Sequence, residues 1–224
     1  SKDYADSRRG EIDPNRVSSE TPAMEPVKTG GDTTYFCVAD GEGNCVSWIH
    51  SLSNAFGSGF IAGDTGVIFN NRGGRGFSLV EGHPNEIEPG KRTMHTLNCY
   101  MTTKNGQPAI VGGTPGGDFQ PQSGLQILTN LIDYNMDPQE AVEAPRWWSF
   151  PGTDPDSLDT PMELRVEPGM PEAAIQELEK LGHKVARRSP GVYDGHVQVI
   201  VLDRERGILK GASDPRGDGH AAAW

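Results

Sequence analysis

The sequence predicts an α+β fold in which short strands and a few helices are joined by many tight turns. Runs of β-forming residues recur, as in Thr34–Ala39 and His196–Leu202, and such runs are typical of strands. Two stretches, after Gly117 and after Pro171, carry apolar residues at helical spacing. The 224 residues include 29 glycines and 17 prolines, which favours short elements over a helical bundle.

Composition and charge exclude several function classes. The formal net charge is −11 at pH 7, which argues against binding to nucleic acid or an anionic membrane, because both need basic patches. No apolar run approaches the roughly 20 residues of a membrane span, and nothing at the start reads as a signal peptide. We therefore expect no nucleic-acid or membrane partner. The compartment stays open, with the cytoplasm slightly favoured, because the true N-terminus is absent.

The cysteines and histidines do not indicate a metal site. The three cysteines lack metal-ligand spacing, and an odd number gives no disulfide framework. They are Cys37, Cys45 and Cys99. The six histidines do not cluster in sequence as ligands would. We therefore expect neither a metal ion nor an organic cofactor.

Residues 1–32 have the composition of a surface linker or tail. They hold Arg8-Arg9-Gly10, Asp13-Pro14 and a stretch rich in Ser, Thr, Pro and Glu from Ser18 to Pro26. No core pattern follows Tyr4 in this segment. We expect the folded part of the chain to begin after it.

A hairpin is predicted next, with strands Thr34–Ala39 and Cys45–Ser51 joined by a glycine-rich turn. Antiparallel pairing would bring Ser51 alongside Thr33, because both residues lie at the ends away from the turn. A threonine hydroxyl is a poor nucleophile unless a base adjoins it, and a free amine on the same residue supplies that base. If the Asp32-Thr33 bond is cut, Thr33 carries both groups. Otherwise Thr33 merely begins an edge strand.

The middle of the chain is expected to alternate loops with short strands. Arg72-Gly73-Gly74-Arg75-Gly76 reads as a flexible loop with two cations. The strand expected over Thr93–Thr103 carries His95 and Thr96, and a lone histidine on a strand is more often structural than catalytic. The other elements expected here are a loop, a buried strand, a hairpin turn and its returning strand, at Asn54–Gly59, Val67–Phe69, Asn105-Gly106 and Pro108–Val111.

A glycine-rich turn, Gly112–Asp118, links that returning strand to a helix. The apolar residues predicted for one face of this helix are Leu125, Leu128, Leu131 and Ile132. A strand, a glycine turn and a helix start together expose backbone N–H groups to an anion or an oxyanion. No phosphate-loop lysine follows, and the spacing is not that of a dinucleotide site, so we reject nucleotide binding.

The rest of the chain predicts two more helices and three more strands. One helix begins at Asp137-Pro138 and stops before Pro145. Another opens at Pro171 and closes at Gly182. The inward residues of this second helix are expected to be Ala174, Ile175, Leu178 and Leu181. The strands are His183–Arg187, His196–Leu202 and Ile208–Ala212.

The order of these pieces resembles the small subunit of the γ-glutamyltransferase family of N-terminal-nucleophile hydrolases, from Thr33 nearly to the end. Each motif is modest alone, but their shared order is highly specific. The motifs are Thr33-Thr34, Phe56-Gly57-Ser58-Gly59, Ala62-Gly63-Asp64-Thr65-Gly66, Phe69-Asn70-Asn71, Pro89-Gly90-Lys91-Arg92, Thr114-Pro115-Gly116-Gly117, Asp133-Tyr134, Ala144-Pro145-Arg146 and Gly211-Ala212-Ser213-Asp214-Pro215-Arg216.

The resemblance implies a four-layer αββα sandwich, made as a precursor that cuts itself between Asp32 and Thr33. Residues 1–32 would be the tail of a large subunit, and residues 33–224 the catalytic small subunit. The large subunit from the same precursor would be the obligate partner, and a small-molecule amide would be the substrate. Thr33 would attack this amide to form an acyl-enzyme, which water or an amine resolves.

The resemblance also assigns roles to particular residues. Ser51 takes the position of a second hydroxyl beside the nucleophile, in agreement with the hairpin pairing. Gly116 and Gly117 would donate the N–H groups of the oxyanion hole. His95 and Thr96 stand where the family has paired serines that contact the substrate carboxylate.

The chain departs from the family where the substrate's α-ammonium is held by an Asn, a Gln and an Asp. The matching positions are Ser53 (Asn54 if the alignment slips), Arg72 and, less surely, Arg75. Guanidiniums would repel an ammonium. We therefore expect an acyl group that lacks a free α-ammonium or carries extra negative charge, as in oxamate or a glutaryl group, and the oxamate amidohydrolase branch is the most attractive example.

Two other readings stay open. In one, the arginines point elsewhere, and the chain performs γ-glutamyl transfer or glutathione hydrolysis. In the other, the precursor is never cleaved and serves as a non-enzymatic scaffold subunit. The presence of Thr33, Ser51, Gly116 and Gly117 together favours an enzyme.

Overall fold

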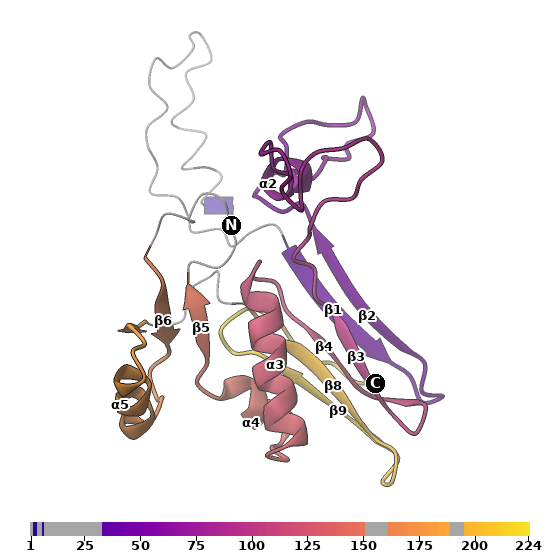
Figure 1. Cartoon of the computed structure of the whole chain (residues 1–224). Coiled ribbons are helices and arrows are strands. Elements are labelled where there is room, and N and C mark those ends of the chain that lie inside the picture. Colours follow the sequence, from indigo (N-terminus) through magenta and orange to yellow (C-terminus); the bar gives the residue numbers. More distant parts are fainter. Residues whose placement is uncertain (1, 4–5, 7–32, 151–160, 189–194) are drawn as a thin grey trace.

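The computed structural model describes residues 2–3, 6, 33–150, 161–188 and 195–224 (Figure 1). Apart from residues 2, 3 and 6, the predicted tail, including the carbonyl of Asp32, therefore lies outside the described residues. The mixed α+β content that the sequence predicts is confirmed. The strands and helices, in chain order, are β1 Thr33–Ala39, β2 Cys45–Ser51, α2 Arg72–Gly76, β3 Tyr100–Lys104, β4 Gln107–Gly113, α3 Phe119–Ile132, α4 Pro138–Glu143, β5 Trp147–Phe150, β6 Glu163–Val166, α5 Glu172–Lys180, β7 Val185–Arg187, β8 Gln198–Asp203 and β9 Ile208–Ser213.

Strands β1 and β2 form the predicted hairpin, and its register is the predicted one. Thr33 pairs with Ser51 at the open end, and Ala39 pairs with Cys45 beside the turn. The turn is fixed by the Asp40 carboxylate, which accepts N–H bonds from Glu42 and Asn44, each 2.9 Å long. The hairpin therefore holds the end of β1 and the end of β2 side by side.

A four-stranded sheet in the order β3-β4-β8-β9 packs between this hairpin and two helices. Because side chains alternate along a strand, β4 turns one set of residues toward the helices and the other set toward the hairpin. Its Ile110 joins the core formed with Ile127 of α3 and Val142 of α4. Its Gly113 lies against the ring of Tyr35 from β1. The strand that ends at the glycine turn is thus clamped beside the strand that begins at Thr33.

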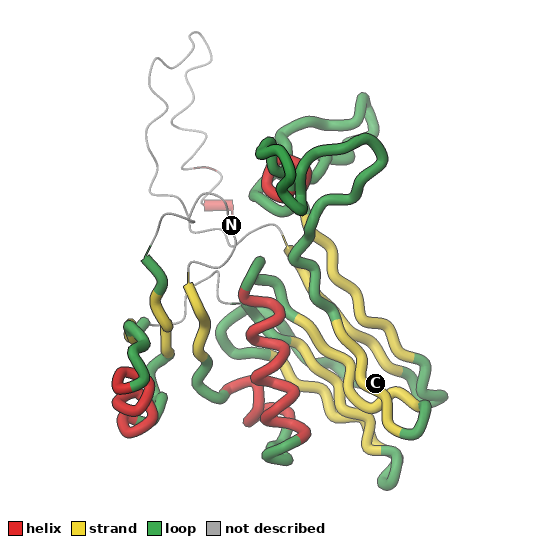
Figure 2. Tube along the Cα trace, in the orientation of Figure 1, coloured by secondary structure: helices red, strands yellow, loops and turns green. Residues whose placement is uncertain are grey.

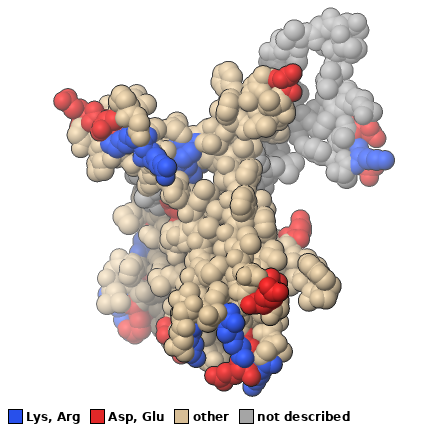
Figure 3. Space-filling model, turned by 90° about the vertical axis from the view of Figure 1, so that its right-hand side faces the viewer, with Lys and Arg blue, Asp and Glu red and all other residues tan. Residues whose placement is uncertain are grey.

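The outer face of the hairpin is apolar and exposed. Phe36 and Trp48 stack with ring centroids 6.3 Å apart, and each is about half exposed, as are Val38 and Val46. Figure 3 views the molecule from this side and shows a broad area without Lys, Arg, Asp or Glu. In the described part of the chain, helices cover the four-stranded sheet but not this face (Figure 1). The described residues thus account for three layers of an αββα sandwich.

The predicted apolar faces of two helices are only partly correct. In α3 the residues that are buried include Phe119, Ser123 and Ile127, whereas Leu125 and Ile132 are exposed. The face of α3 that meets the sheet therefore includes small polar residues, and apolar periodicity could not identify it. In α5 only Ile175 is buried, and the C-cap residue Leu181 is exposed.

Residues 52–99 form a lobe of loops at the open end of the hairpin (Figure 2). It contains the short helix α2, where the sequence predicted a loop, and two isolated bridges, Ile61↔Ile68 and Ser78↔Glu86. The strand predicted from Thr93 begins only at Tyr100, because residues before Tyr100 have no β4 partner to pair with. The Asn105-Gly106 turn is confirmed, with both residues at positive φ.

The remaining strands form a separate three-stranded sheet in the order β5-β6-β7. Strand β6, which the sequence did not predict, pairs antiparallel with β5 and parallel with β7. Helix α5 connects the two parallel strands. Within the described ranges, no helix is long and apolar enough to cross a membrane.

Candidate active site

The hydroxyl groups of Thr33 and Ser51 meet at the open end of the hairpin. Their Oγ1 and Oγ atoms are 2.7 Å apart, and either atom can be the donor. The N–H of Ser53 donates to the same Ser51 oxygen at 2.9 Å. A hydroxyl that accepts an N–H bond keeps its own proton available for donation, so Ser51 can stabilise negative charge that develops on the Thr33 oxygen.

Ser53 is held in a strained and buried position beside this pair. Its φ is 76°, which is rare for a residue with a side chain, and it is only 8% exposed. Its Oγ atom is buried and has no hydrogen-bond partner among the described residues. Strained backbone and unpaired buried polar atoms are most often found at functional sites, so the Ser53 hydroxyl is available to a ligand.

The predicted oxyanion turn follows β4 and leads into α3. Gly116 and Gly117 have φ values of 124° and 54°, a conformation that residues with side chains rarely adopt. The N–H groups of Phe119 and Gln120 donate to the carbonyls of these two glycines, at 3.0 and 3.1 Å. Within the described part of the chain, the N–H groups of the two glycines themselves have no acceptor. N–H groups that have no acceptor among the described residues are what an oxyanion hole requires.

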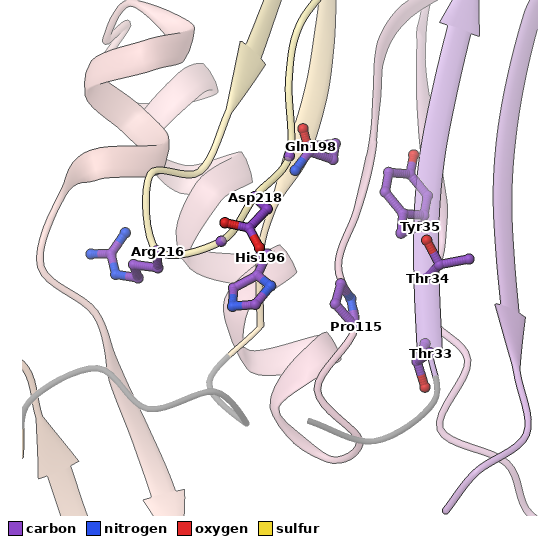
Figure 4. Close-up of a pocket in the computed structure, with 10 residues that line it drawn as sticks. Thr33, Thr34, Tyr35, Pro115, His196, Gln198, Arg216 and Asp218 are labelled. Carbon is purple, nitrogen blue, oxygen red and sulfur yellow. The ribbon is translucent and has the colours of Figure 1, made fainter. Parts of the chain in front are cut away.

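A cavity of about 490 Å³ connects the turn to the nucleophile, because Thr33 and Pro115 both line it (Figure 4). His196, Arg216 and Asp218 from the start of β8 and the loop after β9 line the same cavity. Sequence reasoning gave these three residues no role. The Asp-Pro-Arg motif was a signal that the terminal loop mattered, but only the fold shows that the loop reaches the nucleophile.

The two arginines lie beside Ser53, on α2. Arg72 donates to Thr96 Oγ1 at 3.0 Å, and Arg75 donates to Asn54 Oδ1 at 2.6 Å. The N–H of Asn54 donates to the Asn71 side chain, which ties α2 to the end of β2. Burial, and then the charge of Arg75, lower the pKa of Arg72. The carboxylate of Asp118 acts in the opposite direction. Two guanidiniums this close together repel a cation, and Asp118 offsets part of that repulsion.

The structure brings most of the predicted site residues together. Thr33, Ser51 and Ser53 form one cluster, and Arg72, Arg75 and Thr96 form a second cluster next to it. His95 is exposed, while its neighbour Thr96 is half-buried. Of the predicted pair, Thr96 makes the contact with α2, because its hydroxyl accepts the hydrogen bond from Arg72. Among the described residues, no group of three or more His, Cys, Asp or Glu side chains is placed to hold a metal ion.

Comparisons with known proteins identify the family of this chain. The family model described as gamma-glutamyltranspeptidase matches residues 1–224. The chain is 44% identical over 225 residues to the "Glutathione hydrolase-like YwrD proenzyme" of Bacillus subtilis, covering 98% of this chain and 40% of the relative. It is 38% identical over 205 residues to the "Oxamate amidohydrolase proenzyme" of Klebsiella pneumoniae, covering 88% of this chain and 36% of the relative.

A solved structure gives the same result for the fold. The cephalosporin acylase of Bacillus halodurans superposes with a TM-score of 0.74 at 37% identity, over 100% of this chain and 38% of that chain. This chain therefore spans well under half the length of these three relatives. With the match to the family model over its whole length, it belongs to the γ-glutamyltranspeptidase family of N-terminal-nucleophile hydrolases.

Proposed function

We propose that this chain is the catalytic part of a self-processing N-terminal threonine amidohydrolase. The contact between Thr33 Oγ1 and Ser51 Oγ at 2.7 Å is the observation that carries the proposal. In the precursor, the Thr33 oxygen attacks the carbonyl carbon of Asp32, and the peptide nitrogen leaves as the Thr33 amine. The resulting ester is hydrolysed by water, which frees the new N-terminus. Residues 1–32 then belong to the large subunit and residues 33–224 to the small subunit.

The mature site would use the same atoms on a substrate amide. The Thr33 amine accepts the hydroxyl proton while the Thr33 oxygen attacks the amide carbon. The N–H groups of Gly116 and Gly117 bind the oxyanion, and Ser51 donates to the attacking oxygen. The amine of the substrate leaves with a proton, and water or another amine then resolves the acyl-enzyme. No cofactor is needed for these steps.

The acyl group would be small and acidic. Arg75 bonds to Asn54, the residue after Ser53, and Thr96 orients Arg72 through its hydroxyl. His95 is the less certain contributor, because it is exposed. Guanidiniums bind carboxylates through paired N–H groups, so oxamate-like amides and glutaryl-type acyl groups both fit. The relative named oxamate amidohydrolase supports this choice.

A second candidate function is γ-glutamyl transfer or glutathione hydrolysis. The relative named glutathione hydrolase-like is 44% identical to this chain, and this observation favours it. It requires an α-ammonium to be accepted near two guanidiniums. We place it second for that reason.

The proposed partner is a large subunit from the same precursor. Two observations support it: the chain spans 40% of a relative that is named a proenzyme, and the outer face of the hairpin is apolar and exposed. A helical layer of the large subunit would cover Phe36 and Trp48 and complete the sandwich.

Mass spectrometry of the full-length precursor tests the proposal. We expect a fragment that begins at Thr33 to accumulate during incubation, and Thr33→Ala to abolish it. The processed protein should then hydrolyse oxamate faster than a γ-glutamyl anilide. A precursor that stays a single chain after prolonged incubation would support the scaffold reading instead. Brisk turnover of the anilide with none of oxamate would support the second function.

A further inference from the structure

We propose that Arg146 is a positioning residue for the oxyanion turn, which it holds in place from behind through Phe119 and Gly195. This inference rests on the proposed function, because it concerns the same reaction. It assigns a task to a side chain that touches neither the nucleophile nor the two glycine N–H groups.

Arg146 is one of the most deeply buried side chains among the described residues, with 1% exposure. It lies between α4 and β5. Its Nη1 donates to Ser123 Oγ at 3.3 Å, and its Nη2 to the Gly195 carbonyl at 3.5 Å. Its guanidinium carbon lies 5.4 Å from the centre of the Phe119 ring, within the range of a cation–π contact. The guanidinium thus touches both α3 and Gly195, three residues before β8.

Both of these neighbours adjoin the glycine turn. Phe119 is the first residue of α3, and its N–H bonds to the Gly116 carbonyl at 3.0 Å. Gly195 packs behind the turn so closely that a Cβ atom there would lie 2.7 Å from the Pro115 carbonyl and 2.5 Å from Thr114 Oγ1. The turn is therefore held on one side by the start of a helix and on the other by a backbone that Arg146 anchors.

Two carboxylates fix Arg146 in turn. Its Nη2 is 2.9 Å from Asp214 Oδ2, and its backbone N–H donates to Glu167 Oε2 at 2.9 Å. Arg216 pairs with the same two carboxylates, at 2.6 Å to Glu167 and 3.0 Å to Asp214. Burial alone would lower the pKa of Arg216, but its bond to Glu167 and the charge of Asp214 raise it. The two arginines and the two carboxylates therefore form one paired cluster.

The network also reaches the cavity that contains the nucleophile. Asp214 Oδ2 accepts the N–H of Val197 at 3.1 Å, which fixes the chain next to His196. Arg216 lines the cavity together with Thr33, and its Nη1 and Nη2 donate to the carbonyls that end α4. A buried ion pair adds little net stability compared with apolar packing. Its main effect here is therefore to fix geometry.

Geometry matters most at an oxyanion hole. Loss of one donor typically lowers the rate by about 10²–10³-fold, and a misplacement of about 1 Å lowers it by about 10²-fold. Because the oxyanion exists only in the transition state, a displaced turn should lower kcat and leave substrate binding nearly unchanged.

The test is Arg146→Lys in the full-length precursor. Lysine keeps the charge but cannot contact Ser123, Gly195 and Asp214 through one planar fork. We expect kcat for oxamate to fall by about 10–100-fold, with KM and the affinity for the product oxalate within about twofold. The matched control is Arg165→Lys, because Arg165 also pairs with a carboxylate, Glu163, and lies over a ring, Phe150, away from the site. The control should keep the wild-type kcat.

Gly195→Ala supplies an independent variant. It leaves the Arg146 and Arg216 side chains and their two carboxylate partners unchanged. The added Cβ atom pushes directly on the Pro115 carbonyl, so the variant should give the same fall in kcat with unchanged KM. If a variant does not cleave itself, its two subunits can instead be co-expressed as separate chains, with Thr33 placed at the N-terminus of the small subunit. A folded Arg146→Lys enzyme with wild-type kcat, or with a raised KM as its main defect, would overturn the inference. A wild-type protein without cleavage or turnover would instead overturn the proposed function.

Discussion

Replacing Arg72 by glutamine should shift substrate preference from acidic acyl groups toward γ-glutamyl groups. The guanidinium is partly buried and held by Thr96, so a substrate carboxylate would meet a donor that is already oriented and partly desolvated. A hydrogen bond to a charged group contributes about 1.5–3 kcal/mol, and about 1.4 kcal/mol corresponds to a tenfold change. Loss of this bond should therefore lower kcat/KM for oxamate by about 10–100-fold.

The same substitution should help the competing substrate. Removal of one positive charge weakens the repulsion of an α-ammonium, which costs several kcal/mol when both groups are desolvated. We therefore expect kcat/KM for a γ-glutamyl anilide to rise in Arg72→Gln while that for oxamate falls. Steady-state kinetics on both substrates measure the ratio directly. Arg206→Gln is the control, because Arg206 is exposed in the β8–β9 turn and pairs with Asp203 at the surface.

Two outcomes separate charge from shape at this position. Arg72→Lys keeps the charge but loses the paired N–H groups, so it should keep part of the preference for oxamate. If Arg72→Gln leaves both kcat/KM values at the wild-type level, the guanidinium does not face the acyl group. The argument from charge would then be refuted, and glutathione hydrolysis would become the first candidate.

Three further predictions concern the hairpin and its neighbour. Ser51→Ala should lower kcat by about 10²-fold, whereas Ser51→Thr, which keeps the hydroxyl, should retain most of the activity in the same assay. Ser53→Ala removes a buried hydroxyl without a partner, so the thermal midpoint should stay equal or rise, while KM for oxamate rises. Trp48→Ser should weaken the pairing of the two subunits by about 10–100-fold, because burial of a large apolar side chain contributes about 1.5–3 kcal/mol. Sedimentation measurements test this prediction. Leu181→Ser is the control, because Leu181 is an exposed apolar residue at the end of α5.

The sequence predicted the pairing of Thr33 with Ser51 because a hairpin needs only local information. Once the turn is located, the lengths of the two strands fix which residues face each other, and Thr33 and Ser51 follow. The positive φ values of Gly116 and Gly117 were predictable for the same reason, since the glycines occur between a clear strand and a clear helix.

Features that depend on distant contacts were not predictable. The buried face of α3 includes Ser123 because Arg146 reaches it from 23 residues away in sequence, and no periodicity records such a contact. The extended segment before Tyr100 looks like a strand locally, but β4 ends before it can pair with it. The role of Gly195 is likewise hidden, because a single glycine just before a strand gives no sign that it packs on Pro115.

Selection of the acyl group and stabilisation of the oxyanion depend on separate parts of the fold. Arg72 is held by the loop lobe through Thr96, and the glycine turn is held by Arg146 through Phe119 and Gly195. In the described part of the chain, Arg72 and Arg146 share no hydrogen-bond partner, although the charge of Asp118, just before α3, acts on Arg72. Effects at sites that are not in contact add in free energy. The double variant Arg72→Gln/Arg146→Lys should therefore show the substrate preference of the first change and the kcat loss of the second. A kcat/KM for oxamate that departs from the product of the two single effects by more than about threefold would mean that the turn and the arginine cluster move together.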